Sequence, residues 1–176
     1  MFYHDNHTHH RFRPFSAREV FKVEYCIERA VPADIEAIVR FQAAIVEETE
    51  PHALNPAPMR DGVCRVFDDP AVGFYLMARD DDGVPAGCLM IQREWSDWRN
   101  AYIWWVHSVY VAPEHRRRGV LQVMLGNAES LAQTDGAVGL RLLTDRENTP
   151  AHAAYRKTGF TRSHYDVMEK MFGEKK

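Results

Sequence analysis

The chain has 176 residues, of which 45% are hydrophobic and 27% charged, and its formal net charge is −3. That length fits one domain with its own core, and the lack of a basic surplus argues against nucleic acid as the main partner. Apolar runs are too short to span a membrane, the N-terminus lacks a signal-peptide core, and the three cysteines form no CxxC pair. The sequence therefore predicts a cytoplasmic protein with reduced thiols, no membrane contact and no metal centre.

Residues 1–23 differ from the rest of the chain because they are polar and rich in histidine. Four histidines there could bind zinc or nickel: His4, His7, His9 and His10. A disordered tail or a non-native extension is the prediction, so the folded domain is expected to span residues 24–176.

Hydrophobic periodicity and turn residues predict the remaining elements in chain order. The first half is expected to hold a strand at 25–30, helices at 32–47 and 59–67, and strands at 73–79 and 86–92 joined by a turn at 80–83. The second half is expected to hold a strand at 102–111, a helix at 119–133, a strand at 140–142, a helix at 148–157 and a final extended segment at 160–171 that counts as a strand. Because strand 102–111 is apolar on both faces, it is placed inside a mixed α/β sheet with helices on both faces.

The stretch Val109–Leu121 carries the strongest functional signal. An apolar strand ends in a turn that contains Arg116–Arg118 and Gly119, and an amphipathic helix begins at once. Free N–H groups at a helix start, together with arginines and a glycine, make an anion site. A solvated arginine run is the alternative, and a dinucleotide site is disfavoured because the turn has one glycine rather than three.

A second pattern lies in the helix at 148–157. Asn148, Ala151 and Tyr155 share one face of this helix, and Gly159-Phe160 follows it. Taken alone, Asn148 is a helix cap and Tyr155 a core aromatic residue.

Together the two patterns resemble the signatures of the GCN5-related N-acetyltransferase (GNAT) superfamily, and the resemblance covers about residues 25–171. The first signature is Arg or Gln, two residues, Gly, one residue, then Gly or Ala; Leu121 departs from it at the last place. The resemblance implies a mixed, mostly antiparallel sheet with helices on both faces and a splayed pair of central strands.

The same resemblance implies acetyl-CoA as the cofactor and leaves a homodimer open. It assigns cofactor binding to Val109, Tyr110, Val111, Arg116, Arg117, Arg118, Gly119, Val120, Leu121, Asn148, Ala151 and Tyr155. Tyr155 is also the candidate proton donor to the leaving thiolate, since a phenol with a pKa of about 10 can serve that role.

The acceptor side is less well defined by the sequence. Some superfamily members carry a glutamate on the strand that here spans 102–111, where this chain has no carboxylate. Glu94 is therefore the candidate base, with Asp97 and His107 as alternatives. Glu47, Glu48 and Glu50 lie in a region that often covers the acceptor in this superfamily, although a solvated helix end is the preferred interpretation. The candidate acceptor-binding residues are Trp98, Trp104 and Trp105, although at least one of the last two is expected in the core.

The sequence thus predicts an acetyl-CoA-dependent N-acetyltransferase that acetylates a primary amine of a small molecule or protein by direct transfer. A sensor or regulatory module that binds acyl-CoA without turnover is the alternative, because Leu121 and the missing strand carboxylate depart from the pattern. A nucleic-acid-binding protein that uses Arg116–Arg118 is disfavoured by the net charge.

Overall fold

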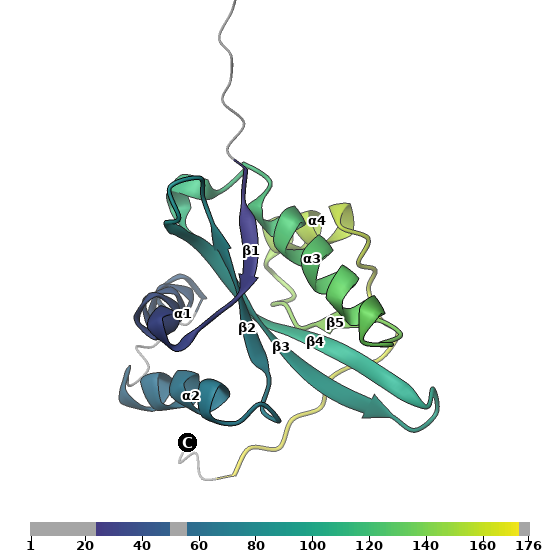
Figure 1. Ribbon diagram of the computed structural model, residues 1–176. Coiled ribbons are helices and arrows are strands. Elements are labelled where there is room, and N and C mark those ends of the chain that lie inside the picture. Colours follow the sequence, from purple (N-terminus) through teal and green to yellow (C-terminus); the bar gives the residue numbers. More distant parts are fainter. Residues whose placement is uncertain (1–23, 50–55, 173–176) are drawn as a thin grey trace, which may run out of the picture.

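The computed structural model describes residues 24–49 and 56–172 (Figure 1). The predicted tail at residues 1–23, with its histidines, lies outside the described residues. The elements are β1 (Cys26–Arg29), a 3₁₀ turn (Pro32–Asp34), α1 (Ile35–Thr49), α2 (Pro56–Asp68), β2 (Phe74–Arg79), β3 (Pro85–Ser96), β4 (Ala101–Val111), a second 3₁₀ turn (Pro113–His115), α3 (Val120–Thr134), β5 (Leu140–Leu142) and α4 (Thr149–Lys157).

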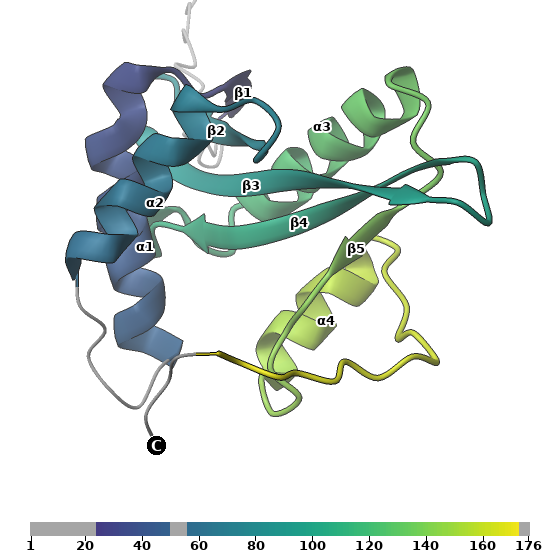
Figure 2. The ribbon, with the colours of Figure 1, turned by 90° about the horizontal axis from the view of Figure 1, so that it is seen from below.

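The strands form one mixed sheet in the order β1-β2-β3-β4-β5. Strands β1 to β4 pair with their neighbours in antiparallel fashion, and β5 alone is parallel to β4. Figure 2 shows β3 and β4 as long neighbours, with β5 crossing beside the end of α4. The predicted mixed, mostly antiparallel sheet is confirmed.

Helices cover both faces of the sheet, as expected. One core cluster joins α1 and α2 to alternate side chains of β2 and β3, including Ile38, Tyr75 and Met77. The other joins α3 to the opposite face through Trp104 and Met124, with side chains of α4 packed against it. In Figure 1 the pair α1 and α2 accordingly lies on one side of the sheet, and α3 and α4 lie on the other.

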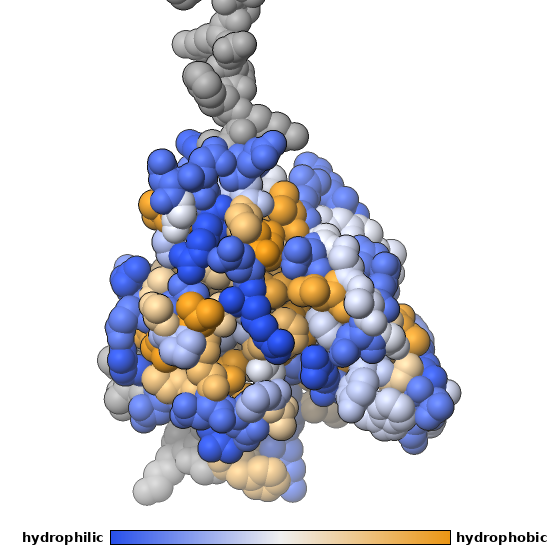
Figure 3. Space-filling view, in the orientation of Figure 1, coloured by the Kyte–Doolittle hydropathy of each residue, from blue (hydrophilic) through white to orange (hydrophobic). Residues whose placement is uncertain are grey.

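The exposed face around β1 combines a hydrophilic border with an apolar strip between β1 and α3 (Figure 3). Tyr25 and Ile27 contribute partly buried side chains to the core beneath α3. The edge strand β1 is thereby tied to the helix that begins at the predicted anion site.

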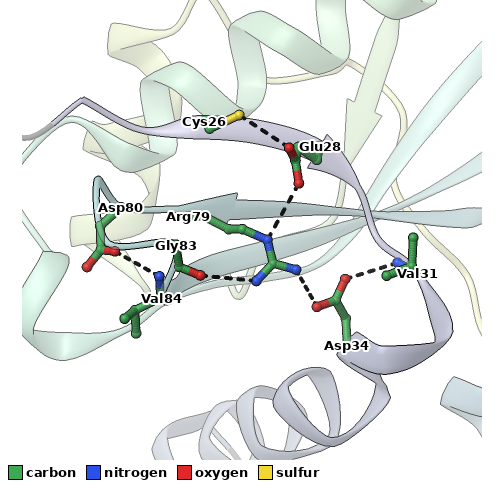
Figure 4. A network of polar contacts seen from close by, with 8 residues as sticks. All are labelled: Cys26, Glu28, Val31, Asp34, Arg79, Asp80, Gly83 and Val84. Atoms are coloured by element: carbon green, nitrogen blue, oxygen red, sulfur yellow. Dashed lines mark hydrogen bonds and ion pairs between the residues drawn. The ribbon is translucent and has the colours of Figure 1, made fainter.

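A polar network centred on Arg79 joins β1, the start of α1 and the β2–β3 hairpin (Figure 4). The guanidinium pairs with Asp34, lies 3.6 Å from the Glu28 carboxylate and donates to the Gly83 carbonyl at 3.3 Å. Asp34 also accepts a hydrogen bond from the Val31 N–H at 3.0 Å. The buried Asp34 carboxylate thus caps the helix start and is neutralised by Arg79.

Two predicted elements differ from the structure. Strand β3 continues to Ser96, four residues beyond the predicted end at 92, because its cross-strand pairing with β4 persists as far as Ser96 opposite Ala101. The segment 160–171 was expected to be a final strand, and within the described residues it belongs to no strand. Its side chains favour strands, but a strand also needs a partner strand to pair with. The sequence pattern of one segment does not show whether such a partner is present.

Candidate functional site

The turn before α3 has the geometry of an anion site. Arg117 and Gly119 have φ values of 63° and 89°, in the left-handed region, and Gly119 is the residue that caps α3. The first helical bond runs from the Val123 N–H to the Gly119 carbonyl at 3.1 Å. The N–H groups of Val120, Leu121 and Gln122 therefore have no partner within the helix and are available to a phosphate oxygen.

Beside this turn, β4 and β5 diverge. Their parallel pairing covers three register positions, Trp104–Val106 opposite Leu140–Leu142, while β4 continues to Val111. A bulge lies near Ser108, whose φ is 50°, so the register against β3 shifts there. Among the described residues, the edge of β4 from His107 to Val111 therefore has no partner strand on the β5 side, and the predicted splay is present.

Arg116 is held away from the turn's free N–H groups. Its Nε donates to the Val111 carbonyl at 2.9 Å, and its Nη2 lies 2.6 Å from Glu48 at the end of α1. The guanidinium also stacks over the Tyr110 ring at 5.4 Å. We had expected all three arginines to add charge around the anion, but Arg116 instead joins α1 to β4, which leaves the exposed Arg117 and Arg118 for that role.

The pairing of Arg116 also affects the predicted backbone contacts. The Val111 carbonyl already accepts a hydrogen bond from Arg116. The backbone groups of Val109 are therefore the better candidates to pair with an extended ligand. Tyr110 points to the other face of the sheet, where its ring packs against Phe41 at 5.1 Å and its hydroxyl donates to Glu48 at 3.4 Å.

Helix α4 places the second motif. The Asn148 side chain accepts from the Ala151 N–H at 3.0 Å, so it caps the helix. The half-buried Tyr155 packs edge-on against Phe160, with ring centroids 5.9 Å apart. Burial raises the pKa of the Tyr155 phenol, which keeps it protonated at neutral pH and able to donate.

A polar cluster lies at the other end of β4. The Glu94 carboxylate accepts from the indole N–H of Trp105 and from Arg141 of β5, whose Nη1 is 3.1 Å away. Trp105 stacks on His107 with ring centroids 6.0 Å apart. Burial lowers the pKa of His107, which favours the neutral imidazole.

A cavity of about 730 Å³ brings together residues from both predicted sets. Glu94, Trp98, Trp105 and Tyr155 all line it, whereas the residues of the anion turn do not. Sequence reasoning missed Arg141, because its partner Glu94 is 47 positions away and no local pattern marks the pair.

The three tryptophans have different environments. Trp98 is 84% exposed at the β3–β4 turn, and Trp105 is half-buried beside Glu94. Trp104 is only 2% exposed and packs edge-on against Phe74 at 5.5 Å, so it belongs to the core and not to the acceptor wall. The expectation for Trp104 as an acceptor-binding residue is corrected, because its position in β4 turns it toward α3.

The described residues also contain no helix long and apolar enough to cross a membrane. Within 24–49 and 56–172, no group of three or more His, Cys, Asp or Glu side chains is arranged to hold a metal ion. The three cysteines are free thiols, and burial raises the pKa of Cys88 to about 12.

Comparison with known proteins points to one family. The model of the acetyltransferase (GNAT) family matches residues 36–160. Streptothricin acetyltransferase from Streptomyces lavendulae is 27% identical over 157 residues, which cover 77% of this chain and 81% of that protein.

Solved structures share the fold. A possible acetyltransferase from Clostridium difficile 630 has a TM-score of 0.78 at 28% identity, covering 85% of this chain and 99% of that one. An aminoglycoside acetyltransferase from an uncultured soil metagenomic sample has a TM-score of 0.67 at 14% identity, covering 85% and 97% of the two chains. At that identity the second likeness concerns the fold alone.

Proposed function

This chain belongs to the acetyltransferase (GNAT) family, and on that premise we propose that it transfers an acetyl group from acetyl-CoA to a primary amine. The observation that carries the proposal is the edge of β4 without a β5 partner, which runs from the turn before α3 to the point where β5 begins to pair. Val109 on this edge and Tyr155 of α4 pack against the same core. An acyl donor with a pyrophosphate, an extended amide-bearing arm and a thioester fits this arrangement. The pyrophosphate would lie at the turn, the arm along the edge of β4, and the thioester at its far end.

The donor would be held mainly by the backbone. The N–H groups at the start of α3 would bind the pyrophosphate, with Arg117 and Arg118 adding charge at the turn. Backbone groups of Val109 would pair with the arm as a strand edge does, and its N–H would polarise the thioester carbonyl. Asn148 and Ala151 would contact the arm from the start of α4.

Direct transfer needs two proton movements from residues of this chain. The amine must lose a proton as it attacks, and the thiolate that leaves must gain one. Tyr155, kept neutral by burial, would donate to the sulfur. Glu94 would take the amine proton directly or through a water molecule, and His107, which burial favours in its neutral form, is the second candidate for this base.

The acceptor pocket contains both signs of charge. Besides Glu94 it is lined by Asp97 and Asp166, with Trp98 and Trp105 as aromatic faces for an ammonium group. More arginines than acids line it: Arg99, Arg141, Arg146, Arg156 and Arg162. An acceptor screen should therefore include streptothricin, aminoglycosides and polyamines, together with amines that carry a carboxylate.

Calorimetric titration of acetyl-CoA into the protein, with CoA and NADH as controls, tests the donor. We expect saturable acetyl-CoA binding and none by NADH, followed by CoA thiol release when the screen supplies the right amine. Binding without thiol release across the screen would favour a sensor that lacks turnover. No binding at millimolar acetyl-CoA would refute the proposal.

A further inference from the structure

A buried histidine lies directly before the turn that precedes α3. His115 ends the second 3₁₀ turn and is only 8% exposed, whereas the three arginines that follow it are exposed. Buried polar side chains are ordinarily paired with other polar groups. The partners of His115 come from two distant parts of the chain, and the chemistry proposed above makes no use of them.

The two ring nitrogens of His115 have different partners. Nδ1 shares a hydrogen bond of 3.2 Å with the hydroxyl of Tyr25, and the two rings meet edge-on with centroids 5.8 Å apart. Nε2 lies 3.8 Å from the carboxylate of Asp80, whose side chain is also mostly buried. A proton on Nε2 suits both sides, because the imidazole then accepts from the Tyr25 hydroxyl and turns its N–H toward the carboxylate.

Both partners are themselves held in place. Tyr25, just before β1, packs against the core beneath α3. Asp80 stabilises the β2–β3 hairpin, because it accepts from the Asp82 N–H at 3.1 Å and from the Val84 N–H at 2.8 Å, the second of which is drawn in Figure 4. His115 therefore connects the start of the turn before α3 to β1 and to the hairpin.

The turn, residues 116–119, is fixed at both ends by buried residues. At its start the Arg116 N–H donates to the Pro113 carbonyl at 3.2 Å, next to the buried His115, and at its end Val120 is only 1% exposed. Between them Arg117 has a φ of 63°, a conformation that a residue other than glycine keeps only where the surrounding structure imposes it. The shape of the turn thus depends on what holds its ends.

We propose that His115 is a positioning residue for the donor site. Through Tyr25 and Asp80 it fixes the start of the turn, and thereby the direction of the N–H groups that would bind the pyrophosphate. A turn that already has its binding shape loses less conformational entropy when the anion binds, so its affinity is higher. The inference rests on the proposed binding of acetyl-CoA at this turn.

The first test removes the contacts of His115. Tyr25→Phe keeps its ring in the core but loses the hydroxyl, and His115→Phe loses both nitrogen contacts; Tyr102→Phe, near the start of β4, is the control. Calorimetry should show acetyl-CoA binding about threefold weaker for Tyr25→Phe, about 10-fold weaker for His115→Phe and unchanged for Tyr102→Phe. Wild-type affinity in His115→Phe would overturn this inference alone. A wild-type protein that does not bind acetyl-CoA would overturn the proposed function as well.

The second test separates positioning from charge. Asp80→Asn keeps an oxygen for the hairpin N–H groups but no longer offers a carboxylate to His115, and Asp82→Asn makes the same charge change in the same hairpin. Loss of a negative charge by itself favours an anion, so electrostatics alone would make both variants bind acetyl-CoA more tightly. We expect Asp80→Asn to bind it about threefold more weakly than Asp82→Asn. Equal or tighter binding by Asp80→Asn would contradict the proposal.

A probe without a pyrophosphate distinguishes positioning of the turn from a general loss of structure. S-acetylpantetheine carries the arm and the thioester only, and ligand-observed NMR can measure its weaker binding. We expect His115→Phe to bind this probe as the wild type does, because only the turn before α3 is affected. A loss of the same factor for S-acetylpantetheine and acetyl-CoA would show that His115 merely stabilises the fold, and would overturn its role in positioning.

Discussion

The two ends of β4 differ in how their functional groups are brought together. At the Val111 end, the backbone edge and the anion turn come from one continuous stretch of chain. At the other end, Glu94, Trp105 and Arg141 come from three paired strands, and their side chains meet there. Residues in one stretch are positioned by local backbone geometry, whereas residues from three strands depend on the register of the whole sheet.

The largest expected effect concerns Tyr155, which lines the same cavity as Glu94 and Trp105. Tyr155→Phe keeps the ring against Phe160 but removes the proton donor, so turnover should fall by about 100-fold or more with little change in acetyl-CoA affinity. Thiol release and calorimetry measure the two quantities separately. The control Tyr165→Phe alters an exposed phenol on the same cavity and should keep turnover near the wild-type value. Equal losses in both variants would remove the catalytic role of Tyr155.

At the donor end, Gly119→Val should weaken acetyl-CoA binding by roughly 10- to 100-fold. Gly119 has a φ of 89° and no atom nearer than 3.8 Å to an added Cβ, so the penalty comes from backbone strain and not from a clash. Gly136→Val is the matched control, since Gly136 has a φ of 74° and open space around it and follows the opposite end of α3. Both variants should lose similar stability, but only Gly119→Val should lose affinity, and an equal affinity loss would contradict the anion turn.

A smaller effect is expected for Glu48, which holds Arg116 on the Val111 carbonyl. Glu48→Gln should bind acetyl-CoA about two- to fivefold more tightly than Glu47→Gln, because it releases Arg116 to add positive charge at the turn before α3. The effect is small because exposed ion pairs contribute about 1 kcal/mol at most. Glu47 is the neighbouring exposed carboxylate, so both variants remove the same charge from the end of α1. Titration of both variants at low and high salt would separate the effect of the lost charge from the effect of the lost contact with Arg116. Identical affinities would show that the pair with Glu48 does not keep Arg116 from the cofactor.

The smallest expected effect concerns pH. Because burial lowers the pKa of His107, the unfolded chain takes up a proton first as pH falls below about 6.5, and stability should decrease there. The loss should stay below about 1 kcal/mol, since the imidazole is only half-buried. Urea midpoints at pH 7.5 and 5.5 should differ less in His107→Gln than in the wild type or His152→Gln. An unchanged pH dependence in His107→Gln would exclude His107 as its source.

The sequence by itself was sufficient for the fold class and for the local geometry of the turn before α3 and of helix α4. Each depends on residues close together in the chain: Gly119 follows three arginines directly, and Asn148 caps the helix that carries Tyr155. Hydrophobic periodicity likewise located every helix, because a buried face repeats with the period of its own backbone.

Tertiary structure decided the features that depend on distant partners. It turned Trp104 into the core and Trp105 toward Glu94, paired Glu94 with Arg141, and drew Arg116 to Glu48 rather than to the anion. Among the described residues, it also left 160–171 outside any strand, although their composition favours one. Whether such a segment becomes a strand, and which charge a carboxylate meets, depends on neighbours that only the folded chain provides.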